Sequence, residues 1–86
     1  MMNDNDDMTI LDVCKINAPF GFIKRNVIYL VDKGSNLNIQ DEYGETALIC
    51  VCRIDDIETA KILVDKGANL DLQDKDGWTA LMFACL

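Results

Sequence analysis

The chain has 86 residues, half of them hydrophobic, and eight Lys and Arg against fifteen Asp and Glu give a formal net charge of −7. This length accommodates one small domain, and the scattered basic residues do not supply the concentrated positive charge that nucleic acid requires of a partner. No apolar run approaches the roughly 20 residues of a membrane helix, and the acidic start is unlike a signal peptide, so we expect no membrane partner and a cytoplasmic or nuclear location.

The N-terminal part of the chain combines a polar tail with a helical pattern. Residues 1–7 are predicted to be a disordered acidic N-terminus. Residues 18–21, Ala-Pro-Phe-Gly, predict a loop. Apolar residues then recur at helical spacing and are expected to face the core: Phe20, Ile23, Val27, Leu30 and Val31.

The middle of the chain predicts two short helices in succession. Thr46 is a suitable N-cap for an apolar helix over residues 47–52, which must be covered on more than one side because it has no polar face. Asp55, with Glu58 three positions later, resembles a capping box that begins the second helix. Its expected core-facing residues are Ile57, Ala60, Leu63 and Val64. Gly67 is predicted to end this helix, since glycine readily adopts the left-handed conformation there.

The segment after Gly67 predicts an extended arm with a tight turn, because Leu70 and Leu72 alternate with polar residues before an Asp-Lys-Asp-Gly turn.

The whole pattern repeats along the chain. Residues 30–34, Leu-Val-Asp-Lys-Gly, recur unchanged at residues 63–67, and at the same offset 14 of the 23 positions from Leu30 to Cys52 are identical. A short helix pair with a protruding arm cannot bury its own apolar face, so neighbouring units are expected to stack.

These repeated motifs resemble the ankyrin repeat, whose period of about 33 residues they share. Asp41-x-x-Gly44-x-Thr46-Ala47-Leu48 and its copy at residues 74–81 are similar to the family's Asp-x-x-Gly-x-Thr-Pro-Leu-His opening, and residues 62–70 are similar to its Leu-Leu-Leu-x-x-Gly-Ala-Asp-Val close. Several positions depart from the family pattern: Ala47 and Ala80 replace proline, Ile49 and Met82 replace histidine, and Asp55 replaces glycine. We expect these departures to affect stability more than the fold.

The resemblance implies an all-α ankyrin-repeat solenoid of helix-turn-helix units with β-hairpin-like loops, about two and a half repeats long. Residues 8–34 are then a divergent N-terminal capping repeat, residues 35–67 an ankyrin repeat, and residues 68–86 an incomplete repeat with its first helix only. Leu81, Phe83 and Leu86 would lack full cover. Three interpretations of the C-terminal end follow: the front of a longer array, a truncated gene product, or a protein that covers its open end with another chain, for which self-association through the uncapped end is one route.

The resemblance also implies a non-catalytic protein–protein interaction module without cofactors, which binds a protein partner of unknown identity through hairpin tips and a concave helix face. The matching positions are Asp41, Glu42, Tyr43 and Glu45 on the first hairpin, Asp74, Lys75, Asp76 and Trp78 on the second, and Arg53 on a helix. Tyr43 and Trp78 are the favoured contacts because exposed aromatic rings are enriched at binding hot spots. Structural roles remain open: Asp41 and Asp74 bonding their own turns, Tyr43 capping its turn, and Trp78 packing on the next hairpin.

One alternative function is an N-terminal fragment of a longer ankyrin array that acts as the regulatory or substrate-recruiting region of an enzyme or adaptor complex. An enzyme active site within the chain is disfavoured, because there is no histidine and no glycine-rich phosphate loop. Four cysteines, Cys14, Cys50, Cys52 and Cys85, are expected to be reduced and to act as small core residues. The spacing of Cys50 and Cys52 does not suit a zinc site, so no metal is expected.

Overall fold

The computed structural model describes residues 9–85, and the predicted disorder of residues 1–7 concerns residues outside this range. The helices of the described residues are α1 (Ile10–Lys15), α2 (Phe20–Asp32), α3 (Ala47–Arg53), α4 (Ile57–Asp65) and α5 (Ala80–Ala84). Within residues 9–85 the β-type pairing is limited to an isolated antiparallel bridge between Gln73 and Thr79. The predicted all-α architecture is therefore confirmed.

Threonine caps begin α1, α3 and α5. The Thr9 hydroxyl accepts a hydrogen bond from the Asp12 backbone N–H at 3.1 Å, and the Asp12 carboxylate accepts one in return from the Thr9 N–H at 3.1 Å. Thr46 accepts from the Ile49 N–H at 3.1 Å, which confirms its predicted role. Thr79, at the equivalent position of the next repeat, caps α5 in the same way. Each cap satisfies a backbone donor that has no partner inside its helix.

The turn between α3 and α4 corrects the predicted start of the second helix. The N-cap is Asp56, not Asp55: the buried Asp56 carboxylate accepts from the Thr59 N–H at 3.3 Å and from the Thr59 hydroxyl at 2.7 Å. Asp55 instead adopts a φ of +67°. It occupies the left-handed turn position, where the resemblance places a glycine, so its side chain is not the one that caps the helix.

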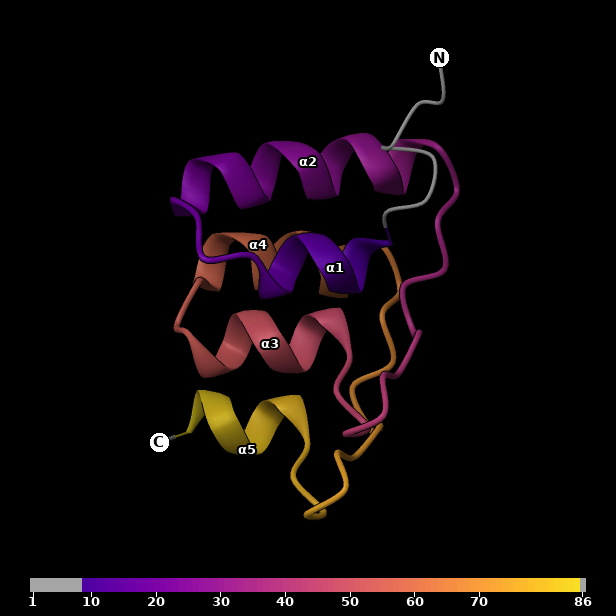
Figure 1. Cartoon of the computed structure of the whole chain (residues 1–86), viewed down its shortest axis with the longest axis vertical. Helices are drawn as coiled ribbons and strands as arrows, with labels where there is room; N and C mark the ends of the chain where they lie inside the picture. The colour runs from indigo at the N-terminus through magenta and orange to yellow at the C-terminus, as the bar shows by residue number, and fades with distance from the viewer. Residues whose placement is uncertain (1–8, 86) are drawn as a thin grey trace.

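The helices form two rows, which Figure 1 shows from the side: α1, α3 and α5 follow one another, and α4 lies behind α1. α2 packs on α1, α4 packs on α3, and α2 and α4 contact each other. α5 packs on α3 without contacting α4. The extended segments that join α2 to α3 and α4 to α5 run along one side of the stack (Figure 1).

The centre of the core is α3, as its apolar sequence predicts. Residues 47–52 are all buried, since α1, α4 and α5 pack around them. From α2, Ile23, Val27 and Leu30 join this core. Phe20 was also expected to face the core, but it is 47% exposed, because it lies at the very start of α2. The helix begins at this residue, so the loop predicted for residues 18–21 is shorter than expected.

The expected core face of α4 is wrong at two of its four positions. Leu63 and Ala60 are buried, but Ile57 is 44% exposed and Val64 is 41% exposed. The buried face is instead Asp56, Thr59, Ala60 and Leu63. α4 contacts α2 and α3 but not α5, so its side toward α5 is open.

Within residues 9–85, no helix combines the length and the hydropathy needed to cross a bilayer. The cytoplasmic or nuclear location stays a prediction.

Candidate partner-binding surface

The two extended segments carry the same tight turn at equivalent positions of successive repeats. Asp41 Oδ1 accepts hydrogen bonds from the backbone N–H groups of Tyr43 and Glu45, both at 2.9 Å. Asp74 Oδ1 accepts from the N–H groups of Asp76 and Trp78, also at 2.9 Å. These two aspartates therefore shape their own turns, which is the structural role that the sequence left open for them.

Hydrogen bonds join the first turn to the second. The Lys75 backbone N–H donates to the Tyr43 carbonyl at 2.9 Å. The Gln40 side-chain amide donates to the carbonyls of Gly44, at 2.9 Å, and Gln73, at 3.0 Å. The two turns therefore form one connected surface whose backbone is held in place before any partner binds.

An ion-pair network links this surface to the helix ends. Lys15, the last residue of α1, pairs with Asp41 and lies 3.7 Å from Glu45, while Arg53 at the end of α3 pairs with Glu45. The hydrogen bond to Asp41 raises the pKa of Lys15, and the hydrogen bond to Glu45 raises the pKa of Arg53. Glu45 is 14% exposed at its side chain, so it is committed to these pairs.

Asp41 experiences opposing effects on its ionisation. Burial raises its pKa, but hydrogen bonds from Lys15 and from the backbone N–H groups of Glu45 and Tyr43 outweigh burial and hold the pKa below its usual range. The charged carboxylate is thus the form that the folded protein favours.

Tyr43 and Trp78 differ in how much of each ring is exposed to a partner. Tyr43 is 49% exposed, and two ammonium groups lie close to its ring, with Lys15 Nζ at 5.7 Å and Lys75 Nζ at 5.5 Å from the ring centroid. Trp78 is half-buried, and its ring packs against the ring of Phe83 of α5, with the two ring centroids 4.9 Å apart. Trp78 therefore packs on the helix that follows it.

The nine predicted contact positions fall into two groups. Five are exposed: Glu42, Tyr43, Arg53, Lys75 and Asp76. Four are partly buried and hold the surface together: Asp41, Glu45, Asp74 and Trp78. Lys15 was not among the contact positions predicted from the sequence. The segments 13–17 and 51–55 are nevertheless alike, and their likeness places Lys15 at the position of Arg53.

A hollow of about 290 Å³ adjoins this surface at the C-terminal ends of α1 and α3. Cys14, Cys50 and Ile54 form apolar parts of its lining, and Lys15 and Arg53 contribute the positive charge. Burial raises the pKa of the Cys50 thiol to about 11, so the thiol stays neutral at physiological pH.

The cysteines are unpaired thiols. Cys14, Cys50 and Cys52 are buried, as expected of small core residues, whereas Cys85 is exposed, because it follows α5 on the open side of the stack. Among residues 9–85, no group of three or more His, Cys, Asp and Glu side chains is placed to hold a metal ion.

Helix pairs that recur at a fixed period, joined by a row of hydrogen-bonded turns, define a stacked helical repeat protein. Residues 16–86 match the family model described as ankyrin repeats, in three copies, and the chain belongs to this family. No curated protein sequence is similar enough to this chain to count as a relative. Ankyrin repeats are generally protein–protein interaction modules and are typically non-catalytic.

Proposed function

We propose that this chain binds a protein partner along its row of turns and the exposed side of its first helices. The observation that carries the proposal is Tyr43, a half-exposed aromatic ring with two lysine ammonium groups close to it, on a turn that is hydrogen-bonded to its neighbour. A rigid, exposed aromatic ring supplies a large contact area with little loss of entropy. The exposed members of the predicted set, with Lys15 added, are the proposed contacts: Lys15, Glu42, Tyr43, Arg53, Lys75 and Asp76.

Lys15 and Arg53 are paired with Asp41 and Glu45, so the remaining charges of the turns, Glu42, Asp74 and Asp76 against Lys75, favour a partner with a basic patch. Glu42 and Asp76 are exposed at the turn tips, and the chain carries a net charge of −7. Charge attraction of this kind accelerates association, and salt screens it. We expect the association rate with the true partner to fall as the ionic strength rises.

The division into repeats is part of the proposal. Each of residues 8–34 and 35–67 contains one helix pair, α1 with α2 and α3 with α4, and residues 68–86 contain α5. A regulatory or substrate-recruiting role within a longer ankyrin protein, the alternative that the sequence left open, would use the same turns.

Affinity capture with the full chain, followed by substitution of Tyr43, tests the proposed surface. Tyr43→Ala is expected to abolish capture of the partner. The matched control is Tyr29→Ala, because Tyr29 is also half-exposed and also carries a lysine over its ring, Lys33 at 5.2 Å, but lies on α2 away from the turns. Tyr29→Ala should leave capture unchanged. Equal capture by both variants would contradict the proposal.

Trp78→Ala is a less direct test, because the indole also packs on α5. Its effect on capture is interpretable only with a circular dichroism spectrum that matches the parent chain. Under that condition we expect weaker capture than with Tyr29→Ala.

A further inference from the structure

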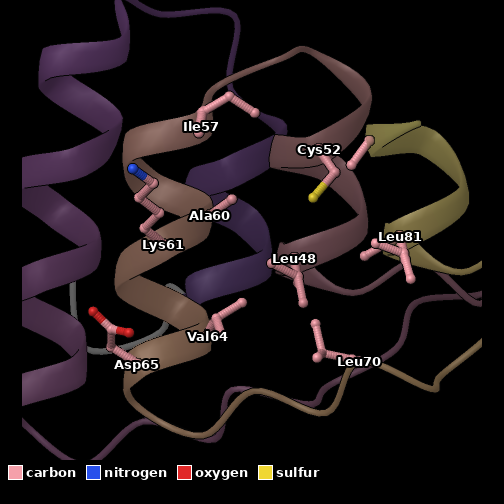
Figure 2. A pocket seen from close by; sticks show the side chains of 11 residues that line it. Leu48, Cys52, Ile57, Ala60, Lys61, Val64, Asp65, Leu70 and Leu81 are labelled. Atoms are coloured by element: carbon pink, nitrogen blue, oxygen red, sulfur yellow. The ribbon is translucent and has the colours of Figure 1, made fainter. Parts of the chain in front are cut away.

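An apolar groove lies between α4 and α5, away from the turns. Its volume is about 230 Å³, and Figure 2 shows Leu48 of α3, Val64 of α4, Leu70 of the extended segment and Leu81 of α5 converging on it. Three of these side chains are well exposed: Val64 by 41%, Leu70 by 46% and Leu81 by 64%. Exposed apolar side chains gathered in one place are typical of interaction surfaces.

One repeat earlier in the stack, the equivalent groove is filled by a helix. Moving its lining residues on α4, the extended segment and α5 back by one repeat gives residues on α2, the segment after α2, and α3. α2 and α3 are the helices against which α4 packs. The groove therefore has the form that accepts a helix, and in the described residues α5 has no second-row helix beside it, whereas α1 has α2 and α3 has α4.

We propose that the occupant is α5 of a second copy of this chain, in a two-fold symmetric dimer. α5 forms one wall of the groove and is itself an apolar helix in need of cover, with Leu81 64% exposed and Met82 47% exposed. In a two-fold symmetric dimer, the same surface of each copy both inserts its helix into the partner and receives the partner's helix. Leu81 of each copy then enters the groove of the other, against Val64.

The charges of this face fit a contact between identical copies. Residues 79–85 contain no charged side chain, so α5 brings no charged side chain of its own into the groove. Lys61 and Asp65, the charged residues of the lining, have opposite signs and stand one helical turn apart. The net charge of −7 on each copy opposes association at long range, and salt screens this repulsion. The dimer should therefore strengthen with salt, opposite to binding of a basic partner.

Sedimentation velocity of the full chain over a range of concentrations tests the dimer. The parent chain is expected to shift from monomer to dimer as concentration rises, and more readily at higher salt. Leu81→Glu, or Val64→Glu on the opposite wall, should weaken association by at least about tenfold, because each places a charge in an apolar contact. Both residues are exposed in the monomer, so circular dichroism should be unchanged.

The matched control is Phe22→Glu, which changes an apolar residue, 39% exposed, on α2. It should dimerise like the parent chain. A mixed sample of isotope-labelled and unlabelled copies should show a contact between the Leu81 methyl groups of one copy and the Val64 methyl groups of the other. A chain that stays monomeric at every concentration, a Leu81→Glu variant that dimerises like Phe22→Glu, or a dimer without this methyl contact would each overturn the proposal.

Discussion

A Cβ atom on Gly44 would lie 2.9 Å from the Cα of Asp74 in the neighbouring turn, whereas a Cβ on Gly77 would meet no atom within 4 Å. Both glycines have a positive φ, +75° and +86°. Alanine at either position thus incurs the cost of the left-handed conformation, and alanine at Gly44 must also push the two turns apart. The difference in stability between the two alanine variants therefore separates the cost of the left-handed backbone conformation from the cost of the clash between neighbouring turns.

We expect Gly77→Ala to lower the free energy of unfolding by about 1 kcal/mol and Gly44→Ala to lower it by about 3 kcal/mol, since steric overlap adds to the backbone term. Urea unfolding followed by circular dichroism measures both. Similar losses in the two variants would mean that the turns can separate without cost.

The neighbouring residues Asp55 and Asp56 should respond oppositely to substitution. Asp56→Ala removes the cap of α4 and is expected to lower the free energy of unfolding by about 2 kcal/mol. Asp55→Gly relieves a positive φ and should raise it by about 0.5 kcal/mol, after allowing for the greater freedom of glycine in the unfolded chain. Urea midpoints of the two variants give the comparison. Loss of stability in Asp55→Gly would show that the Asp55 side chain has a role that the turn geometry does not reveal.

Asp41 should make stability depend on pH in the acidic range. Its folded pKa lies below the unfolded value of about 3.9, so its stabilising contribution is present above that value and is lost as the pH falls through the folded pKa. Asp41→Asn keeps an oxygen for the turn but removes the charge that pairs with Lys15. At pH 7 it should lower the free energy of unfolding by about 1 kcal/mol or less, and this difference should shrink toward pH 3.

Asp74→Asn is the control for Asp41→Asn, because Asp74 makes the same turn hydrogen bonds and forms no ion pair within residues 9–85. Its effect at pH 7 should be smaller. Urea unfolding at pH 7 and pH 3 measures both variants. A loss in Asp41→Asn that does not change between the two pH values would rule out the ion pair as its cause.

The four cysteines should react at two different rates. Cys85 is exposed, whereas Cys14, Cys50 and Cys52 are buried, and burial raises the pKa of all three buried thiols. Because the thiolate is the reactive form, an aromatic disulfide reagent at pH 8 should modify one thiol of the native protein quickly and the others only after unfolding. Cys85→Ser should remove the fast phase, and a fast phase that persists would show that another cysteine is accessible.

Local sequence rules predicted the features whose partners lie within a few residues. Thr46 caps α3 through an N–H three residues away, and Gly67 follows α4 with a positive φ, as expected. The same rules placed the cap of α4 one residue too early, since Asp55 and Asp56 have similar capping propensities. The choice between them depends on the left-handed turn, which the sequence marks only through the ankyrin resemblance.

The sequence by itself determined the repeat, its period and the all-α architecture, because helical spacing, caps and turn residues act over short distances along the chain. Tertiary structure alone decided which side chains are exposed and free of ion pairs, and so available to a partner. Glu45 is neutralised by Lys15 and Arg53, Tyr43 lies close to lysines of two other segments, and Val64 is exposed because α5 packs on α3 without reaching α4. These outcomes depend on how one unit sits on the next, and that offset arises from packing across the stack, which no single segment encodes.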